Sequence, residues 1–130
     1  MNYAVRLDFP PTVNTYYRRH GHVMHLSASG KRYKTVAALG AAVFSGGAKP
    51  LTGRLGVQIE LSAPNKTRDT DIDNRIKAVL DALQGVAFEN DSQIDQLIVK
   101  RLPIDLGGDG YADVIISELT ATQDTHDANR

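Results

Sequence analysis

Three aspartates on alternate positions stand out in the stretch RDTDIDNRIK, which spans residues 68–77. Asp69, Asp71 and Asp73 repel one another, so a chain tolerates them either on a solvated loop or around a bound cation. Carboxylates two residues apart point the same way in an extended segment, where they could share such an ion. The pattern alone is a weak signal, because acidic turns are common. Asp71 or Asp73 could instead be the N-cap of a following helix, which is a purely structural role.

A second acidic turn, ENDSQID, follows at residues 89–95 and offers Glu89, Asp91 and Asp95. The segment between the turns predicts a helix that joins two parallel strands, and such a crossover places its two turns at opposite ends. Asp91 reaches Asp71 only if the loop after the helix folds back along it. Three carboxylates would then gather without cysteine or nearby histidine, a donor set that suits Mg²⁺ and also Mn²⁺.

Lys77 lies four residues after Asp73 and therefore shares a helix face with it. Its ammonium group could offset excess negative charge at a metal site or contact a phosphate. The structural alternative is an ordinary intrahelical ion pair with Asp73.

The charges of the chain are unevenly distributed although the net charge is +0. Residues 9–59 contain no Asp or Glu, whereas residues 60–130 hold 14 of the 15 acids and 7 of the 15 bases. Such asymmetry indicates either a basic surface that meets a polyanion or two halves that attract each other. The cations of the acid-free segment are Arg18, Arg19, Lys31, Arg32, Lys34, Lys49 and Arg54.

The apolar pattern predicts one α+β domain over residues 1–119, with a mixed sheet and two main helices. Residues 120–130 form a polar tail that we expect to be frayed. We expect an irregular loop or a short hairpin around Gly21, and an antiparallel hairpin between the last two strands, joined by the turn IDLGGDG. The expected strands cover residues 3–9, 54–62, 94–102 and 111–119, and the expected helices cover residues 31–44 and 74–84.

Both helices have an apolar stripe that we expect to face the core. Ser27 or Ser29 is the expected N-cap of the first helix, and Gly85 ends the second. The stripe residues are Tyr33, Val36, Ala37, Leu39, Gly40 and Val43 in the first helix, and Ile76, Val79, Leu80 and Leu83 in the second.

Composition excludes several classes of protein. The chain has no cysteine, which rules out disulfides and thiolate metal sites and favours a cytoplasmic location. No apolar run approaches the roughly 18 residues of a membrane span. His20, His22 and His25 lie in a basic loop without carboxylates, and we expect a solvated or phosphate-contacting loop there rather than a zinc site.

The combined motifs resemble the RusA family of Holliday-junction resolvases, which occurs in bacteria and their prophages. The matching stretches are TDIDNRIKAVLDAL, then NDSQI, and near the N-terminus a strand followed by Pro10-Pro11, Asn14 and YYR. The resemblance implies that Asp71, Asp73 and Asp91 are metal-binding catalytic acids and that Lys77 is the catalytic lysine. It further implies a homodimer that nicks four-way DNA junctions with Mg²⁺.

This reading assigns the acid-free segment to DNA binding. Tyr16 and Tyr17 could stack on exposed bases or pack in the core, whereas Tyr33 is expected in the core. The expected DNA-binding residues are Tyr16, Tyr17, Arg18, Arg19, Lys31, Arg32, Lys34, Arg68 and Asn74.

The sequence leaves two alternatives to a nuclease, and it does not decide which surface forms the dimer interface. A non-catalytic junction-binding protein of the same fold is the main alternative, and a DxD sugar transferase is disfavoured by the short chain. The dimer could use the last two strands or the small-residue surface of the first helix, formed by Ala37, Ala38, Ala41 and Ala42.

Overall fold

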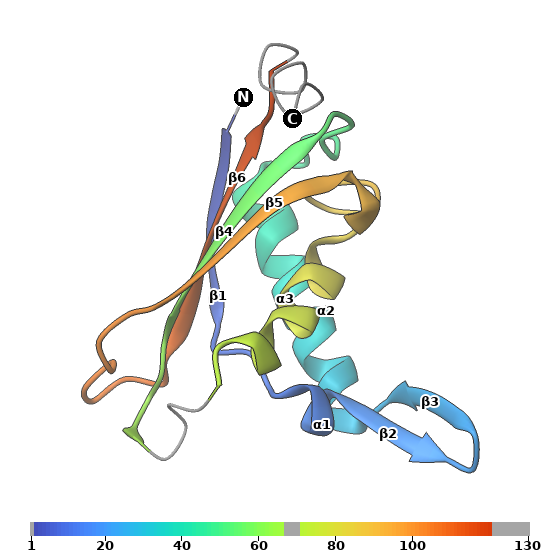
Figure 1. Ribbon diagram of the computed structural model, residues 1–130, viewed down its shortest axis with the longest axis vertical. Coiled ribbons are helices and arrows are strands. Elements are labelled where there is room, and N and C mark those ends of the chain that lie inside the picture. The colour runs from blue at the N-terminus through green and yellow to red at the C-terminus, as the bar shows by residue number, and fades with distance from the viewer. Residues whose placement is uncertain (1, 67–70, 121–130) are drawn as a thin grey trace, which may run out of the picture.

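The computed structural model describes residues 2–66 and 71–120, and it consists of a four-stranded sheet, two main helices and a small hairpin (Figure 1). The predicted tail, apart from Thr120, therefore lies outside the described residues. The strands are β1 (Asn2–Asp8), β2 (Tyr17–His20), β3 (Val23–Leu26), β4 (Leu55–Ser62), β5 (Ile94–Arg101) and β6 (Tyr111–Glu118). The helices are α1 (Val13–Tyr16), α2 (Ala28–Phe44) and α3 (Ile76–Leu83), with single 3-10 turns η2 (Asp73–Arg75) and η3 (Asp91–Gln93).

The sheet is mixed, which confirms the predicted α+β class. Its strand order is β1-β6-β4-β5. β4 and β5 are parallel and are joined through α3, as the crossover prediction required, whereas β6 is antiparallel to both β4 and β1. Alternating side chains of β4 and β6 enter the core beneath the helices, namely Leu55, Val57, Ile59, Leu61, Ala112, Val114 and Ile116.

The predicted hairpin between β5 and β6 is wrong, because β4 lies between them. After β5 the chain wraps around the end of β4: the Asp105 N–H donates to the Ala63 carbonyl, and Tyr111 then pairs with Ser62. Gly110 makes the wrap possible, since it has φ +79° and a side chain there would come within 2.8 Å of the Ser62 carbonyl. The glycine-rich stretch is therefore a close passage around a strand end rather than a tight two-strand turn.

Of the two serines predicted as N-cap of α2, Ser27 has this role, since its hydroxyl accepts a hydrogen bond from the Gly30 N–H at 2.9 Å. The helix therefore starts three residues earlier than predicted. Its predicted apolar stripe is only partly right. Ala37 and Ala41 are buried in the core, whereas three larger stripe residues are exposed, namely Val36, Leu39 and Val43. Small side chains thus let this helix approach the sheet closely, and Ala37 and Ala41 serve the internal core instead of a dimer surface.

Helix α3 follows its predicted stripe, with Val79 and Leu83 buried and Ile76 and Leu80 packed against the core. Tyr33 of α2 also packs there, as expected, and its hydroxyl donates to the Asp8 carbonyl at 2.8 Å. No helix within the described ranges is long and apolar enough to cross a membrane.

The segment around Gly21 is a hairpin of β2 and β3 that projects from the helical side of the molecule (Figure 1). Gly21 has φ +59° and forms its turn. The four cross-strand pairs place Tyr17 opposite Leu26, Arg18 opposite His25, and Arg19 opposite Met24. The hairpin carries most of its side chains in solvent.

Candidate active site

Asp71 and Asp73 lie at the amino-terminal end of the η2–α3 segment, and both are exposed. Ile72 between them packs against the core, so the carboxylates on either side of it face solvent. The predicted N-cap role is wrong for both aspartates, because neither η2 nor α3 has a side-chain cap hydrogen bond. The two carboxylates make no ion pair or hydrogen bond within the described part of the chain. They are therefore free to ligate a cation.

Arg75 fixes this end of the segment and was not predicted as a site residue. Its side chain is buried, its Nη1 donates to the Pro10 carbonyl at 2.6 Å, and its guanidinium lies 4.6 Å from the centroid of the Phe9 ring. These contacts tie the acidic turn to the end of β1. The sequence signal that could have revealed this role is the Pro10-Pro11 stretch, whose carbonyls need donors that no strand supplies.

Lys77 is exposed one turn into the segment, and among the described residues it forms no ion pair with Asp73 or any other acid. It shares a helix face with Asp73 and Asp81. The Asp81 carboxylate accepts a hydrogen bond from the Tyr16 hydroxyl at 2.5 Å and lies 3.7 Å from the Lys34 Nζ. The ammonium group of Lys77 is thus available to a ligand, whereas Asp81 has structural partners.

Asp91 is held firmly by the turn in which it lies. The Asn90 side chain accepts from the Ser92 N–H, and Gln93 Oε1 accepts from the Asn90 N–H at 2.7 Å, which together form a capping box. The buried Gln93 amide also donates to the carbonyls of Leu51 and Gly53, both at 2.9 Å. Gln93 is therefore the anchor of this loop, and an Asn-x-x-Gln capping pattern could have predicted it.

Within one chain, Asp91 lies far from Asp71 and Asp73. The Asp91 N–H donates to Gln84 Oε1 at 3.1 Å, so Asp91 lies beyond the carboxyl end of α3, whereas Asp73 begins the segment. Three 3-10 residues and eight α-helical residues span roughly 18 Å. Accordingly, residues 2–66 and 71–120 contain no group of three acidic or histidine side chains that could hold a metal ion.

The acid-free segment presents cations that are mostly unpaired. Lys34 pairs with Asp81, and Arg54 pairs with Asp95, whose pKa it lowers through their hydrogen bonds. By contrast, Arg18, Arg19, Lys31 and Arg32 are exposed and have no ion pair within the described residues. Attraction between the two halves therefore accounts for only part of the charge asymmetry, and an open basic surface remains.

The adjacent tyrosines of the YY pair differ in position. Tyr16 is fully buried, and burial together with its bond to Asp81 raises its pKa. The prediction that Tyr16 stacks on bases is therefore wrong, because its ring already fills the space between α1 and α3. Tyr17 is the first residue of β2 and is half-buried, and its ring lies edge-on to that of Tyr16 with the two centroids 5.0 Å apart. Asn74 is half-buried next to Asp73, and Arg68 lies outside the described residues.

Comparison with known proteins places the chain in one family. The family model for endodeoxyribonuclease RusA matches residues 8–114. The crossover junction endodeoxyribonuclease RusA of Escherichia coli K12 is 34% identical over 110 residues, which covers 82% of this chain and 88% of that protein. The protein of the same name from Enterobacteria phage HK97 is 31% identical over 105 residues, or 76% of this chain and 82% of that protein. This chain is a member of the RusA endodeoxyribonuclease family.

Proposed function

We propose that this protein is a Mg²⁺-dependent endodeoxyribonuclease that resolves four-way DNA junctions by paired nicks, in recombination and repair in the bacterial cytoplasm. The observation that carries this proposal is the exposed pair Asp71 and Asp73, which has no partner among the described residues, with Lys77 one turn away in a chain of the RusA family. The similarity to phage proteins is consistent with a prophage origin.

The donor set fits a hard divalent cation. Two exposed carboxylates without histidine or cysteine suit Mg²⁺, with Mn²⁺ as a substitute. A bound Mg²⁺ would polarise the scissile phosphate and supply a hydroxide at neutral pH. Asp71 and Asp73 would orient this ion, and the Lys77 ammonium would bind a non-bridging oxygen of the same phosphate.

A second copy of the chain provides the means to complete the site. Because Asp91 and Asp73 of one chain lie at opposite ends of the η2–α3 segment, which is roughly 18 Å long, we propose that the partner subunit's Asp91 joins Asp71 and Asp73. A two-fold dimer then contains two such composite sites, which matches the two-fold symmetry of a four-way junction.

The open edge of β5 is the surface that best supports this dimer. β5 is the last strand of the sheet, contains no proline, and exposes Leu97 and Ile98 on its two faces. Antiparallel pairing of two β5 edges sets the start of one strand beside the end of the other. Asp91 lies in η3, immediately before the start of β5, and the end of β5 lies beside the end of β4, from which the chain leads to Asp71.

The basic surface gives the enzyme its affinity for DNA. Arg18, Arg19, Lys31 and Arg32, all exposed, would contact phosphates without reading sequence, and the proposal includes Lys34 and Asn74 as further DNA contacts. Arg68 belongs to the same proposal through its place in the motif.

A synthetic mobile four-way junction tests the proposal. We expect symmetric cuts with Mg²⁺ and none with a chelator, while binding persists in both conditions. Tight junction binding without cleavage in Mg²⁺ or Mn²⁺ would instead identify a non-catalytic junction-binding protein.

A further inference from the structure

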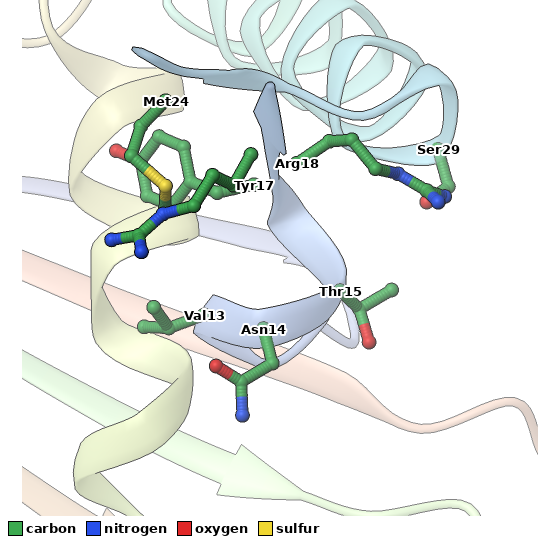
Figure 2. Close-up of a pocket in the computed structure, with 8 residues that line it drawn as sticks. Val13, Asn14, Thr15, Tyr17, Arg18, Met24 and Ser29 are labelled. Atoms are coloured by element: carbon green, nitrogen blue, oxygen red, sulfur yellow. The ribbon is translucent and has the colours of Figure 1, made fainter. Parts of the chain in front are cut away.

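An open cavity of about 630 Å³ lies at the base of the β2–β3 hairpin, where α1, β2, β3 and the start of α2 meet (Figure 2). Its lining combines apolar side chains with an amide and two guanidinium groups. The residues that matter for its chemistry are Val13, Asn14, Tyr17, Arg18, Arg19 and Met24. The cavity is large enough for a nucleobase with its sugar, and it is open to solvent.

One face of the hairpin forms the apolar wall of this cavity. Tyr17, Arg19 and Met24 share that face, because Arg19 is paired with Met24 and Tyr17 lies two residues before Arg19. The Tyr17 ring is supported by the edge-on ring of Tyr16, which is buried and bonded to Asp81. Tyr17 is therefore a positioned ring, while Met24, 52% exposed, is a soft and adaptable neighbour.

The arginine and asparagine side chains of the lining have no partner within the described residues. Neither Arg18 nor Arg19 forms an ion pair there, and the Asn14 amide forms no hydrogen bond. The Tyr17 ring, the Met24 thioether and the Arg19 guanidinium group, which share one face of the hairpin, match a base together with its phosphate. Arg18 lies on the other face and reaches toward Ser29 (Figure 2). The Asn14 amide has both a donor and an acceptor for a base edge.

The cavity also lies close to the proposed site of cleavage. α1 packs against α3, and Figure 2 shows α3 passing beside Val13 and Tyr17. Asp81, which holds Tyr16, lies one helical turn beyond Lys77 on the same face of α3. A nucleotide whose phosphate meets Lys77 would thus have a neighbouring base within reach of this cavity.

We propose that this cavity holds a nucleobase turned out of the stack at the branch point, next to the phosphate that is cut. The inference rests on the proposed function and deepens it, because it makes the enzyme sensitive to an unstacked base as well as to phosphates. A four-way junction offers such bases at lower cost than continuous duplex, since stacking is already interrupted at the branch point.

A coupling experiment between protein and DNA tests this proposal. Junctions carrying a single abasic nucleotide at successive positions around the cut are bound to wild type, Tyr17→Ala and Met24→Ala in chelator. We expect Tyr17→Ala to weaken binding of the intact junction about 5- to 100-fold. With the abasic nucleotide at one particular position, Tyr17→Ala should leave the junction affinity almost unchanged, because the base that Tyr17 contacts is already absent.

Two matched variants complete the design. Val23 lies on the other face of the same hairpin and is 63% exposed. Val23→Ala should therefore show the same junction affinity as wild type at every abasic position. Tyr17→Phe keeps the ring and should retain the coupling. If the loss of affinity from the substitution and the loss from the missing base add at every abasic position, for both Tyr17→Ala and Met24→Ala, the base-binding role is overturned. Failure of the wild type to bind or cut any junction would overturn the proposed function itself.

Discussion

Mixing two inactive variants should restore cleavage if each site is shared between subunits. Asp73→Asn removes one ligand charge, and Asp91→Asn removes the ligand that lies at the far end of α3. Neither change should unfold the protein, because both side chains are exposed and the segment after Asp71 has no side-chain cap to lose. Each variant alone should bind junctions and fail to cut them.

The expected recovery follows from the geometry of the chain. A span of roughly 18 Å prevents Asp91 and Asp73 of one chain from sharing an ion. If subunits exchange freely, half of the dimers contain one copy of each variant, and each of these has one intact and one doubly substituted site. About a quarter of all sites should therefore regain activity, as single nicks rather than paired cuts.

The assay is Mg²⁺-dependent nicking of a labelled four-way junction after the two variants are unfolded and refolded together. Samples refolded separately and then mixed briefly on ice are the control for exchange. Complete inactivity of the co-refolded mixture, with mixed dimers demonstrated by tags of different mass, would refute the shared site. If each site were instead built from a single chain, both sites of every mixed dimer would lack one ligand, and no activity would return.

Three further predictions concern the anchor, the basic surface and the interface. Gln93→Leu removes the amide that donates to the Leu51 and Gly53 carbonyls, and it should lower the free energy of unfolding by about 2–4 kcal/mol. Urea titration measures this loss, and Gln96→Leu, at an exposed position of β5, is the control that should change the free energy of unfolding little. Replacing Arg18 and Arg19 with Ala should weaken binding of all junction sequences alike and reduce the log–log salt slope by roughly one per lost phosphate contact; an unchanged slope would contradict their assignment. The chain has no cysteine, so Ile98→Cys should form a disulfide-linked dimer through the β5 edges under oxidising conditions. Val36→Cys on α2 is the control and should remain monomeric in denaturing gels. Equal cross-linking of both variants would exclude this interface.

The elements were predictable because their signals are local. The two-residue alternation of β4 and the i, i+3, i+4 stripe of α3 both correspond to elements of the structure. The order of the strands in the sheet was not predictable, because it depends on the close approach of Gly110 to the Ser62 carbonyl, a contact between distant parts of the chain. The exposed Val36 and Leu39 show a similar limit, since the alanines of α2 decide which face meets the sheet.

The arrangement of the proposed site residues within one chain was predictable only in part. The crossover pattern correctly places Asp91 and Asp71 at opposite ends of α3, so the residues that one motif suggests are separated in one chain. Tyr16 and Tyr17 are adjacent and chemically identical, yet one is in the core and the other lines a cavity, because the chain changes from α1 to β2 between them. Arg75 and Gln93 have buried structural roles that charge counting overlooks.

The measurement that tests the central claim most directly is cleavage of a supercoiled plasmid bearing an extruded cruciform, with a single binding event allowed per molecule. Paired nicking by a symmetric dimer predicts direct conversion of supercoiled to linear DNA with Mg²⁺, and no product with a chelator. Nicked circles as the only product, or conversion that persists in chelator, would contradict a Mg²⁺-dependent enzyme with two coordinated sites.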